Sequence, residues 1–115
     1  MRVLIVDDDP QNRLLLKLFC KKWGYEVIEA KSGTEGIKKA KEEKPSVILL
    51  DLLLGDIKGE EVIKLLKSQQ ETKNLPVIVI SAYDICEVEG ADAVFPKPLD
   101  FSLLRLTLQK ITRNL

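Results

Sequence analysis

The chain has no histidine, and its 115 residues include only two cysteines and 5% aromatic side chains. Without histidine, Ser-His-Asp or Cys-His catalysis, zinc binding through imidazole and a histidine pH switch are all excluded. Cys20 and Cys86 are too few and too far apart for a disulfide framework or a CxxC site, and we predict that Cys20 lies in or near the core. Any chemistry must therefore use carboxylates, hydroxyls and lysine.

The sequence also lacks an excess of either charge and a long apolar run. Eighteen Lys and Arg residues balance 18 Asp and Glu residues, which argues against a nucleic-acid-binding module with a basic patch. No apolar segment approaches the roughly 20 residues of a membrane span. A strand-like run begins directly after Arg2, which leaves no room for a signal peptide. We expect a soluble, cytoplasmic protein with no nucleic-acid or membrane partner.

Short apolar runs alternate along the chain with longer segments of helical periodicity. The length suits one domain, residues 1–115, and the alternation predicts a parallel sheet with helices on both faces. The first, third and fourth runs are apolar throughout and predict central strands, whereas the second is mixed and the fifth is cut short by Pro96, as in edge strands. The order 2-1-3-4-5 predicts a flavodoxin-like, doubly wound, five-stranded α/β fold. The predicted strands are residues 3–6, 25–29, 47–50, 77–80 and 93–95.

Helix signals fall between these strands. Asp9 and Pro10 start the first helix, which Gly24 ends, and Ser32 with Glu35 has the spacing of a capping box for the second. The remaining two are predicted to begin after residue 59 and near residue 100. Residues 81–92 are too few for a full crossover helix, so we expect a shortened or missing fourth helix. The side chains predicted to face inward are Leu14, Leu15, Leu18 and Phe19, then Val62, Ile63, Leu65 and Leu66, and finally Leu104, Leu108, Ile111 and Leu115.

Polar residues follow four of the predicted strands. The carboxyl ends of parallel strands meet at one edge of the sheet, so these side chains are expected to be neighbours. Singly, they also fit turn acids, a loop hydroxyl and a solvated lysine. Three converging carboxylates repel one another unless a cation or proton compensates, and Mg²⁺ suits such oxygen ligands. An Asp beside Mg²⁺ can accept a phosphoryl group, whose oxygens a lysine and a hydroxyl would bind. The residues concerned are Asp7, Asp8, Asp51, Ser81 and Lys97.

Four stretches carry a resemblance to a known family: LIVDDDPQNR at 4–13, VILLDLLLGDIKG at 47–59, PVIVISA at 76–82 and GADAVFPKPL at 90–99. Over essentially its whole length the chain resembles the receiver domain of two-component response regulators. The resemblance implies that Asp51 is the phosphoacceptor. Asp8 would bind Mg²⁺ directly, Asp7 would bind it through water, and the backbone carbonyl of Leu53 would be a third protein ligand.

The other matched positions surround the phosphoryl group. Ser81 resembles the hydroxyl that moves to hydrogen-bond it, Ala82 the small residue beside that hydroxyl, and Lys97 the lysine that precedes a cis-forming Pro98. Leu53 and Tyr83 flank the acyl phosphate, which predicts a long-lived phosphorylated state.

The resemblance also implies partners. The phosphodonor would be a sensor histidine kinase or a histidine phosphotransfer protein, and small acyl phosphates could replace it. The chain would not be an enzyme beyond self-phosphorylation and autodephosphorylation, and would signal by conformational change to a protein target that the sequence does not identify. A stand-alone regulator is expected, since the chain begins with methionine. Candidate kinase contacts on the first helix are Asn12, Arg13, Leu14, Leu16 and Lys17.

Three features depart from the family pattern. Gly55 stands where most relatives have proline, which loosens that loop. Val94 occupies the position three before Lys97 where an aromatic switch residue is usual, and strand alternation points the adjacent Phe95 to the other face. The interval from Ser81 to Lys97 is also short, and the missing residues fall on the fourth helix.

Three other interpretations are possible. A pseudo-receiver, an interaction module whose acids are relics, is disfavoured by the intact acid, hydroxyl and lysine set. A haloacid-dehalogenase-like phosphatase requires a second Asp two positions after the first, where this chain has Leu53. A cobalamin-binding or flavin-binding domain is disfavoured because there is no histidine to ligate cobalt and the loop after the first strand is acidic.

Overall fold

The computed structural model describes residues 1–82 and 87–113, in which strands and helices alternate along the chain. The strands are β1 (Arg2–Val6), β2 (Glu26–Ala30), β3 (Val47–Asp51), β4 (Val77–Ser81) and β5 (Ala93–Pro96). The helices are α1 (Pro10–Lys22), α2 (Gly33–Glu43), α3 (Gly59–Lys67) and α4 (Phe101–Arg113). No helix in these ranges is long and apolar enough to cross a membrane.

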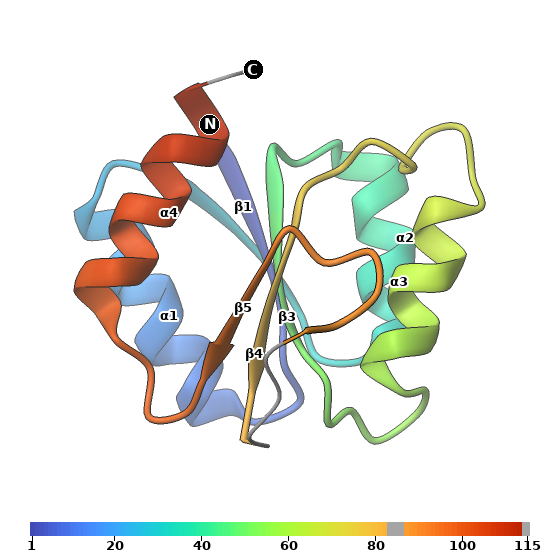
Figure 1. Ribbon diagram of the computed structural model, residues 1–115, viewed down its shortest axis with the longest axis horizontal. Coiled ribbons are helices and arrows are strands. Elements are labelled where there is room, and N and C mark those ends of the chain that lie inside the picture. The colour runs from blue at the N-terminus through green and yellow to red at the C-terminus, as the bar shows by residue number, and fades with distance from the viewer. Residues whose placement is uncertain (83–86, 114–115) are drawn as a thin grey trace.

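The strands form one parallel sheet in the order β2-β1-β3-β4-β5. Helices α1 and α4 cover one face of this sheet, and α2 and α3 cover the other (Figure 1). The predicted doubly wound, flavodoxin-like arrangement is therefore confirmed. Such a fold brings all five carboxyl ends of the strands to one edge.

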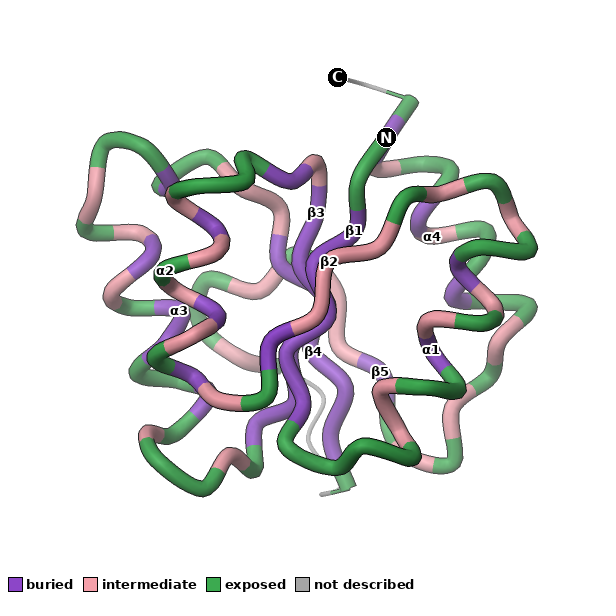
Figure 2. Tube along the Cα trace, turned by 180° about the vertical axis from the view of Figure 1, so that it is seen from behind, coloured by how far each residue is buried: buried purple, intermediate pink, exposed green. Residues whose placement is uncertain are grey.

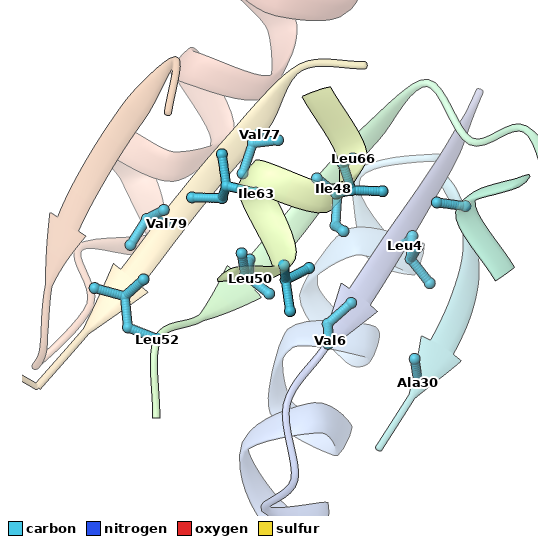
Figure 3. Close-up of a cluster of buried hydrophobic side chains, with 12 residues drawn as sticks. Leu4, Val6, Ala30, Ile48, Leu50, Leu52, Ile63, Leu66, Val77 and Val79 are labelled. Atoms are coloured by element: carbon cyan, nitrogen blue, oxygen red, sulfur yellow. The ribbon is translucent and has the colours of Figure 1, made fainter. Parts of the chain in front are cut away.

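Alternation along the strands divides the core into two clusters, one on each face of the sheet. In β1, Leu4 and Val6 pack toward α2 and α3, whereas Val3 and Ile5 pack toward α1 and α4. Figure 2 shows the buried strands lying between the two helical layers, and Figure 3 shows the cluster on the α2 and α3 side. Because both faces are covered, the central strands must be apolar at every position.

Burial distinguishes the central strands from the edges as predicted. All five residues of β3 and of β4 are buried, whereas β2 and β5 are largely half-buried. The second strand runs one residue later than predicted, because Glu26 pairs with Arg2 and Ala30 pairs with Val6. The edge strand has mixed residues on both sides, so its sequence alone locates its ends poorly.

The predicted N-caps of α1 and α2 are formed. The Asp9 side chain accepts a hydrogen bond from the Gln11 backbone N–H at 2.9 Å, and Ser32 Oγ accepts one from the Glu35 N–H at 3.1 Å. In contrast, α3 begins after Lys58, which makes no side-chain capping hydrogen bond. Of the stripe predicted for α4, Leu104 and Leu108 are buried and Ile111 is half-buried, and Leu115 lies outside the described residues.

The predicted apolar face of α1 is wrong. Leu16 and Cys20, one turn apart, are buried, whereas three of the four residues predicted to face inward are exposed: Leu14, Leu15 and Leu18. Leucines at positions 14, 15, 16 and 18 spread over more than half of the helix circumference, so periodicity does not identify the side that meets the sheet. Cys20 is in the core as predicted, and burial raises the pKa of its thiol to about 12. Cys86 lies outside the described residues.

The connection between β4 and β5 contains no helix in its described part, residues 82 and 87–92. Its end is tied to the sheet by Asp92, whose N–H donates to the Val77 carbonyl and whose Oδ2 accepts from the Val77 N–H, both at 2.8 Å. Val88 and Ala91 pack against the cluster on the α2 and α3 side. The described part of this connection, residues 87–92, therefore covers part of the sheet with a turned segment.

Candidate functional site

The polar residues after the strands lie at one edge of the sheet because the strands end nearly in step. In the sheet register, Val6 pairs with Leu50, Asp51 with Ile80, and Ser81 with Pro96. This register brings together the residues that follow β1 and β5 and the residues that end β3 and β4. The sequence prediction that these side chains share one site agrees with this geometry.

Three carboxylates converge at this edge. One carboxylate oxygen each from Asp7, Asp8 and Asp51 lies within 4.8 Å of the others. Asp7 and Asp51 are buried, with 3% and 7% of their surface exposed, whereas Asp8 faces solvent. The cluster therefore has two buried oxygen donors and one that solvent can reach, a donor set that fits a hard cation such as Mg²⁺.

The charge of Asp7 is poorly compensated within the protein. Burial raises the pKa of this carboxyl from 3.8 to about 6, and the neighbouring charge of Asp51 adds to the rise. A hydrogen bond from the Asp9 N–H to Asp7 Oδ1, at 2.9 Å, acts in the opposite direction. A bound cation would relieve this repulsion.

Asp51 contacts a lysine and the loop that follows it. Lys97 Nζ lies 3.3 Å from Asp51 Oδ2, and the Leu53 N–H donates to Asp51 Oδ1 at 3.0 Å. The Lys97 side chain is 29% exposed, so its ammonium group borders both the buried carboxylate and solvent. The peptide bond between Lys97 and Pro98 is cis, as expected from the resemblance.

The hydroxyl position lies beside this pair. Ser81 is buried at the end of β4, and its carbonyl accepts a hydrogen bond from the Lys97 N–H at 2.8 Å. Ala82 is exposed directly after it. Leu53 is also exposed, at 51%. Tyr83, which with Leu53 was predicted to shield the acyl phosphate, lies outside the described residues.

The position of the usual aromatic switch holds a side chain packed on the sheet. Val94 is half-buried against the cluster on the α2 and α3 side, whereas Phe95 is buried in the cluster on the α1 and α4 side. The two side chains thus face opposite ways, as predicted. Phe95 does not replace the missing aromatic at position 94.

The kinase-contact candidates on α1 differ in accessibility. Leu14 is 53% exposed, whereas Leu16 is buried and faces the sheet, so Leu16 is not available to a partner and its prediction is corrected. Asn12, Arg13 and Lys17 are half-buried.

Arg13 and Lys17 also have internal partners. Arg13 Nη1 donates to the Asp7 carbonyl at 2.7 Å, and its Nε lies 3.6 Å from Glu29 Oε1. Lys17 Nζ lies 3.3 Å from Glu29 Oε2. Arg13 therefore supports the loop that carries Asp7, a role that sequence reasoning missed.

Two further contacts near the site were not predicted. Asp56, five residues after Asp51, accepts hydrogen bonds from the first turn of α2, including one from Thr34 Oγ1 at 2.7 Å. Gly59 packs so closely on the preceding loop that an added Cβ would stand 2.6 Å from the Leu52 Cα. A conformational reason for Gly59 could have been suspected from its place at a helix start, but no spacing rule identifies the partner of Asp56.

Comparisons with known proteins give a consistent result. Residues 3–109 match the response regulator receiver domain model. The chain is 31% identical over 116 residues to Protein PilH of Pseudomonas aeruginosa, with 96% of each chain covered. It is 35% identical over 103 residues to the polar-differentiation response regulator DivK of Brucella ovis, with 84% of each covered.

Solved structures share the fold. The response regulator protein TrrA of Thermotoga maritima, in complex with Mg²⁺-BeF, is 30% identical with a TM-score of 0.87, and the match covers 96% of this chain and 97% of that one. A response regulator from Chloroflexus aurantiacus is 29% identical with a TM-score of 0.90, and the match covers 97% of each chain.

Proposed function

This chain belongs to the response regulator receiver domain family, and from that premise we propose that it accepts a phosphoryl group on Asp51 in a Mg²⁺-dependent reaction. One observation carries the proposal. The carboxylates of Asp7, Asp8 and Asp51 converge within 4.8 Å, and Lys97 Nζ approaches Asp51 Oδ2 to 3.3 Å. Aspartyl phosphorylation needs an acidic cluster that can hold Mg²⁺ and a positively charged side chain beside the acceptor carboxylate, and the three carboxylates and Lys97 supply them.

The residues that would hold Mg²⁺ are the three carboxylates and the Leu53 backbone carbonyl, with Asp8 as a direct ligand and Asp7 acting through water. Such oxygen donors suit Mg²⁺, which usually keeps several waters. When bound, the ion would neutralise charge on the phosphoryl oxygens during transfer. TrrA, described as a complex with Mg²⁺-BeF, supports this assignment by similarity.

In the proposed step, an Asp51 carboxylate oxygen attacks phosphorus and a new P–O bond forms. The P–N bond to the donor imidazole breaks, the ring nitrogen keeps the electron pair, and solvent supplies a proton to the imidazole. The donor is a phosphohistidine on a sensor histidine kinase or a histidine phosphotransfer protein, since this chain has no histidine. Later attack by water on phosphorus breaks the P–O bond to Asp51, which releases inorganic phosphate and returns Asp51 to its free carboxylate.

Three residues of this chain would bind the transferred group. Lys97 Nζ already lies beside Asp51 and would pair with a phosphoryl oxygen, while the Ser81 hydroxyl would donate to another. Ala82, next to Ser81, has only a methyl side chain and leaves space for the group. Because these residues act on a group attached to their own chain, we propose a phosphorylated switch and not an enzyme that turns over a separate substrate.

The donor would approach over the N-terminal half of α1. Leu14 is exposed there, and Asn12 and Lys17 are partly accessible. A cavity of about 270 Å³ lies between this part of α1 and the segment before α4, and Asp7 and Lys97 contribute to its lining together with Leu15 and Phe101. An apolar side chain of a donor protein fits such a cavity. The downstream target would also be a protein, recognised by contact with the phosphorylated state.

The test is labelling with acetyl phosphate and Mg²⁺, read by intact-protein mass spectrometry and phosphate-affinity gel. We expect a single phosphoryl group on the wild type and none on Asp51→Asn. Beryllofluoride with Mg²⁺ should change the amide NMR spectrum around Ser81 and Lys97. A wild-type protein that gains no phosphate and shows no spectral change would instead be a pseudo-receiver.

A further inference from the structure

The loop between Asp51 and α3 is hydrogen-bonded to the start of α2. Asp56 Oδ1 accepts from the Gly33 N–H at 2.9 Å. Asp56 Oδ2 accepts from the Thr34 N–H at 2.9 Å and from Thr34 Oγ1 at 2.7 Å. One carboxylate in the loop thus binds three donors of a helix that precedes it by more than 20 residues.

These bonds make Asp56 part of the N-terminal cap of α2. The first N–H groups of a helix have no intrahelical acceptor, and a negative charge there is favourable. Ser32, directly before α2, accepts a hydrogen bond from the Glu35 N–H through its Oγ. Asp56, in the distant loop, accepts hydrogen bonds from the Gly33 and Thr34 N–H groups. The hydrogen bonds from Thr34 and Gly33 hold the pKa of Asp56 well below its ordinary value, so its carboxylate stays charged.

The two segments also fit closely beside these bonds. A Cβ added to Gly33 would stand 2.5 Å from Ile57 Cγ1 and 2.9 Å from Val62 Cγ2. Glycine is therefore needed at position 33 for the loop to lie directly on the helix. The Asp56 bonds and the Gly33 contact together fix the middle of the loop against α2.

The other hydrogen bonds of this loop lie at its two ends, where the Leu53 N–H donates to Asp51 Oδ1 and the Gly59 N–H donates to the Leu52 carbonyl, both at 3.0 Å. Gly55 gives the backbone freedom at that position, and Lys58 makes no side-chain capping bond to α3. Gly55 lies close to the cation site, since a Cβ there would stand 3.7 Å from Asp8 Oδ2. In the middle of the loop, residues 54–57, Asp56 accepts the side-chain hydrogen bonds.

We infer that Asp56 is a positioning residue for the cation site: through α2 it fixes the loop that presents the Leu53 carbonyl. This inference rests on the proposed function, in which that carbonyl is a Mg²⁺ ligand. Asp56 touches neither the cation nor the phosphoryl group, and acts only by limiting where the Leu53 carbonyl lies. If the loop were mobile, Mg²⁺ binding would have to order the Leu53 carbonyl, and the conformational entropy lost would weaken binding.

The experiment compares Mg²⁺ binding by calorimetry in Asp56→Ala and Ser32→Ala. Each variant removes a side chain that accepts hydrogen bonds from N–H groups in the first turn of α2. Only Asp56→Ala also releases the loop between Asp51 and α3. We expect Asp56→Ala to raise the Mg²⁺ dissociation constant about tenfold, as loss of an outer-shell partner does, and Ser32→Ala to leave it unchanged. High salt in the buffer screens any simple effect of the lost surface charge. Hydrogen exchange should quicken at residues 53–57 in Asp56→Ala alone.

Two further comparisons keep the outcomes separate. Thr34→Ala removes one of the three bonds without changing charge, and should raise the dissociation constant less, in the same direction, even if Asp56→Ala does not fold. Equal Mg²⁺ affinity in wild type, Thr34→Ala and any folded Asp56 variant would overturn the positioning role. So would an equal loss in Ser32→Ala, which would assign the effect to α2 stability. A wild type that binds no Mg²⁺ would refute the proposed function itself.

Discussion

Replacing Asp7 with asparagine should make the metal-free protein more stable, although it removes a proposed Mg²⁺ ligand. Asp7 is 3% exposed and lies within 4.8 Å of two other carboxylates. Its charge is therefore both desolvated and repelled. Asparagine removes that charge and keeps an oxygen that can accept the hydrogen bond from the Asp9 N–H, now 2.9 Å long.

The magnitude follows from the pKa of Asp7, which burial raises from 3.8 to about 6. At about 1.4 kcal/mol per pH unit, ionising this group in the folded protein costs about 3 kcal/mol more than in the unfolded chain. Burying the asparagine amide also has a cost, of roughly 1 to 2 kcal/mol. The net gain in free energy of unfolding should be about 1 to 2 kcal/mol above neutral pH.

The sign of the pH dependence is fixed by the direction of the pKa change. Between pH 3.8 and about 6 the folded protein holds a proton on Asp7 that the unfolded chain has released. The stability that Asp7 contributes is thus fully present below pH 3.8 and is lost as the pH rises through about 6. At pH 4 only the cost of the buried amide remains, so Asp7→Asn should be about 1 to 2 kcal/mol less stable than the wild type. The variant should become about 1 to 2 kcal/mol more stable than the wild type by pH 7 to 8.

The free energy of unfolding of both proteins is measured at each pH by urea denaturation with EDTA present. The signal is the fluorescence of Trp23, the one tryptophan of the chain. Mg²⁺ should then stabilise the wild type by mass action and leave the variant unchanged. If Asp7→Asn were no more stable than wild type at pH 8 without metal, the reasoning would be refuted. The buried charge of Asp7 would then not destabilise the folded protein.

Leu14→Asp should reduce phosphoryl transfer from a cognate histidine kinase and preserve labelling by acetyl phosphate, because Leu14 is exposed; equal loss of both would disprove a docking role. Leu16→Asp should instead unfold the protein, seen by circular dichroism, because Leu16 is buried; a folded variant would contradict the α1 orientation. Gly59→Ala should lower the free energy of unfolding by about 2 to 3 kcal/mol through overpacking against Leu52. Gly24→Ala, with φ of 94° and open space around it, should cost only about 1 kcal/mol, and similar costs for both glycines would refute the close approach.

The sheet could be predicted because buried parallel strands have a simple sequence pattern. Residues 47–50 and 77–80 are apolar at every position, which is typical of strands buried on both faces. The site followed from the sheet, since residues directly after parallel strands must meet at one edge. The short interval after Ser81 likewise predicted a shortened or missing fourth helix, and residues 82 and 87–92 contain no helix.

Side-chain orientation and loop contacts were less predictable. Leucines at positions 14, 15, 16 and 18 leave the buried side of α1 undecided, and only packing against Val3 and Ile5 selects Leu16. The partners of Asp56 lie 22 and 23 residues earlier in the chain. Their meeting depends on the path of the loop and on the absence of a side chain at Gly33. Local sequence patterns contain neither kind of information.

The core on the α1 and α4 side joins the first and last elements of the receiver domain. Val3 and Ile5 of β1 pack in the same cluster as Leu104 and Leu108 of α4. Within the domain a ribosome makes β1 before every other element and α4 after every other one, so this half of the core stays incomplete until the whole domain has been translated. The nascent sheet therefore presents an uncovered apolar face, which is the kind of surface that chaperones bind and that promotes aggregation. Folding of this receiver domain is completed only after α4 has left the ribosome.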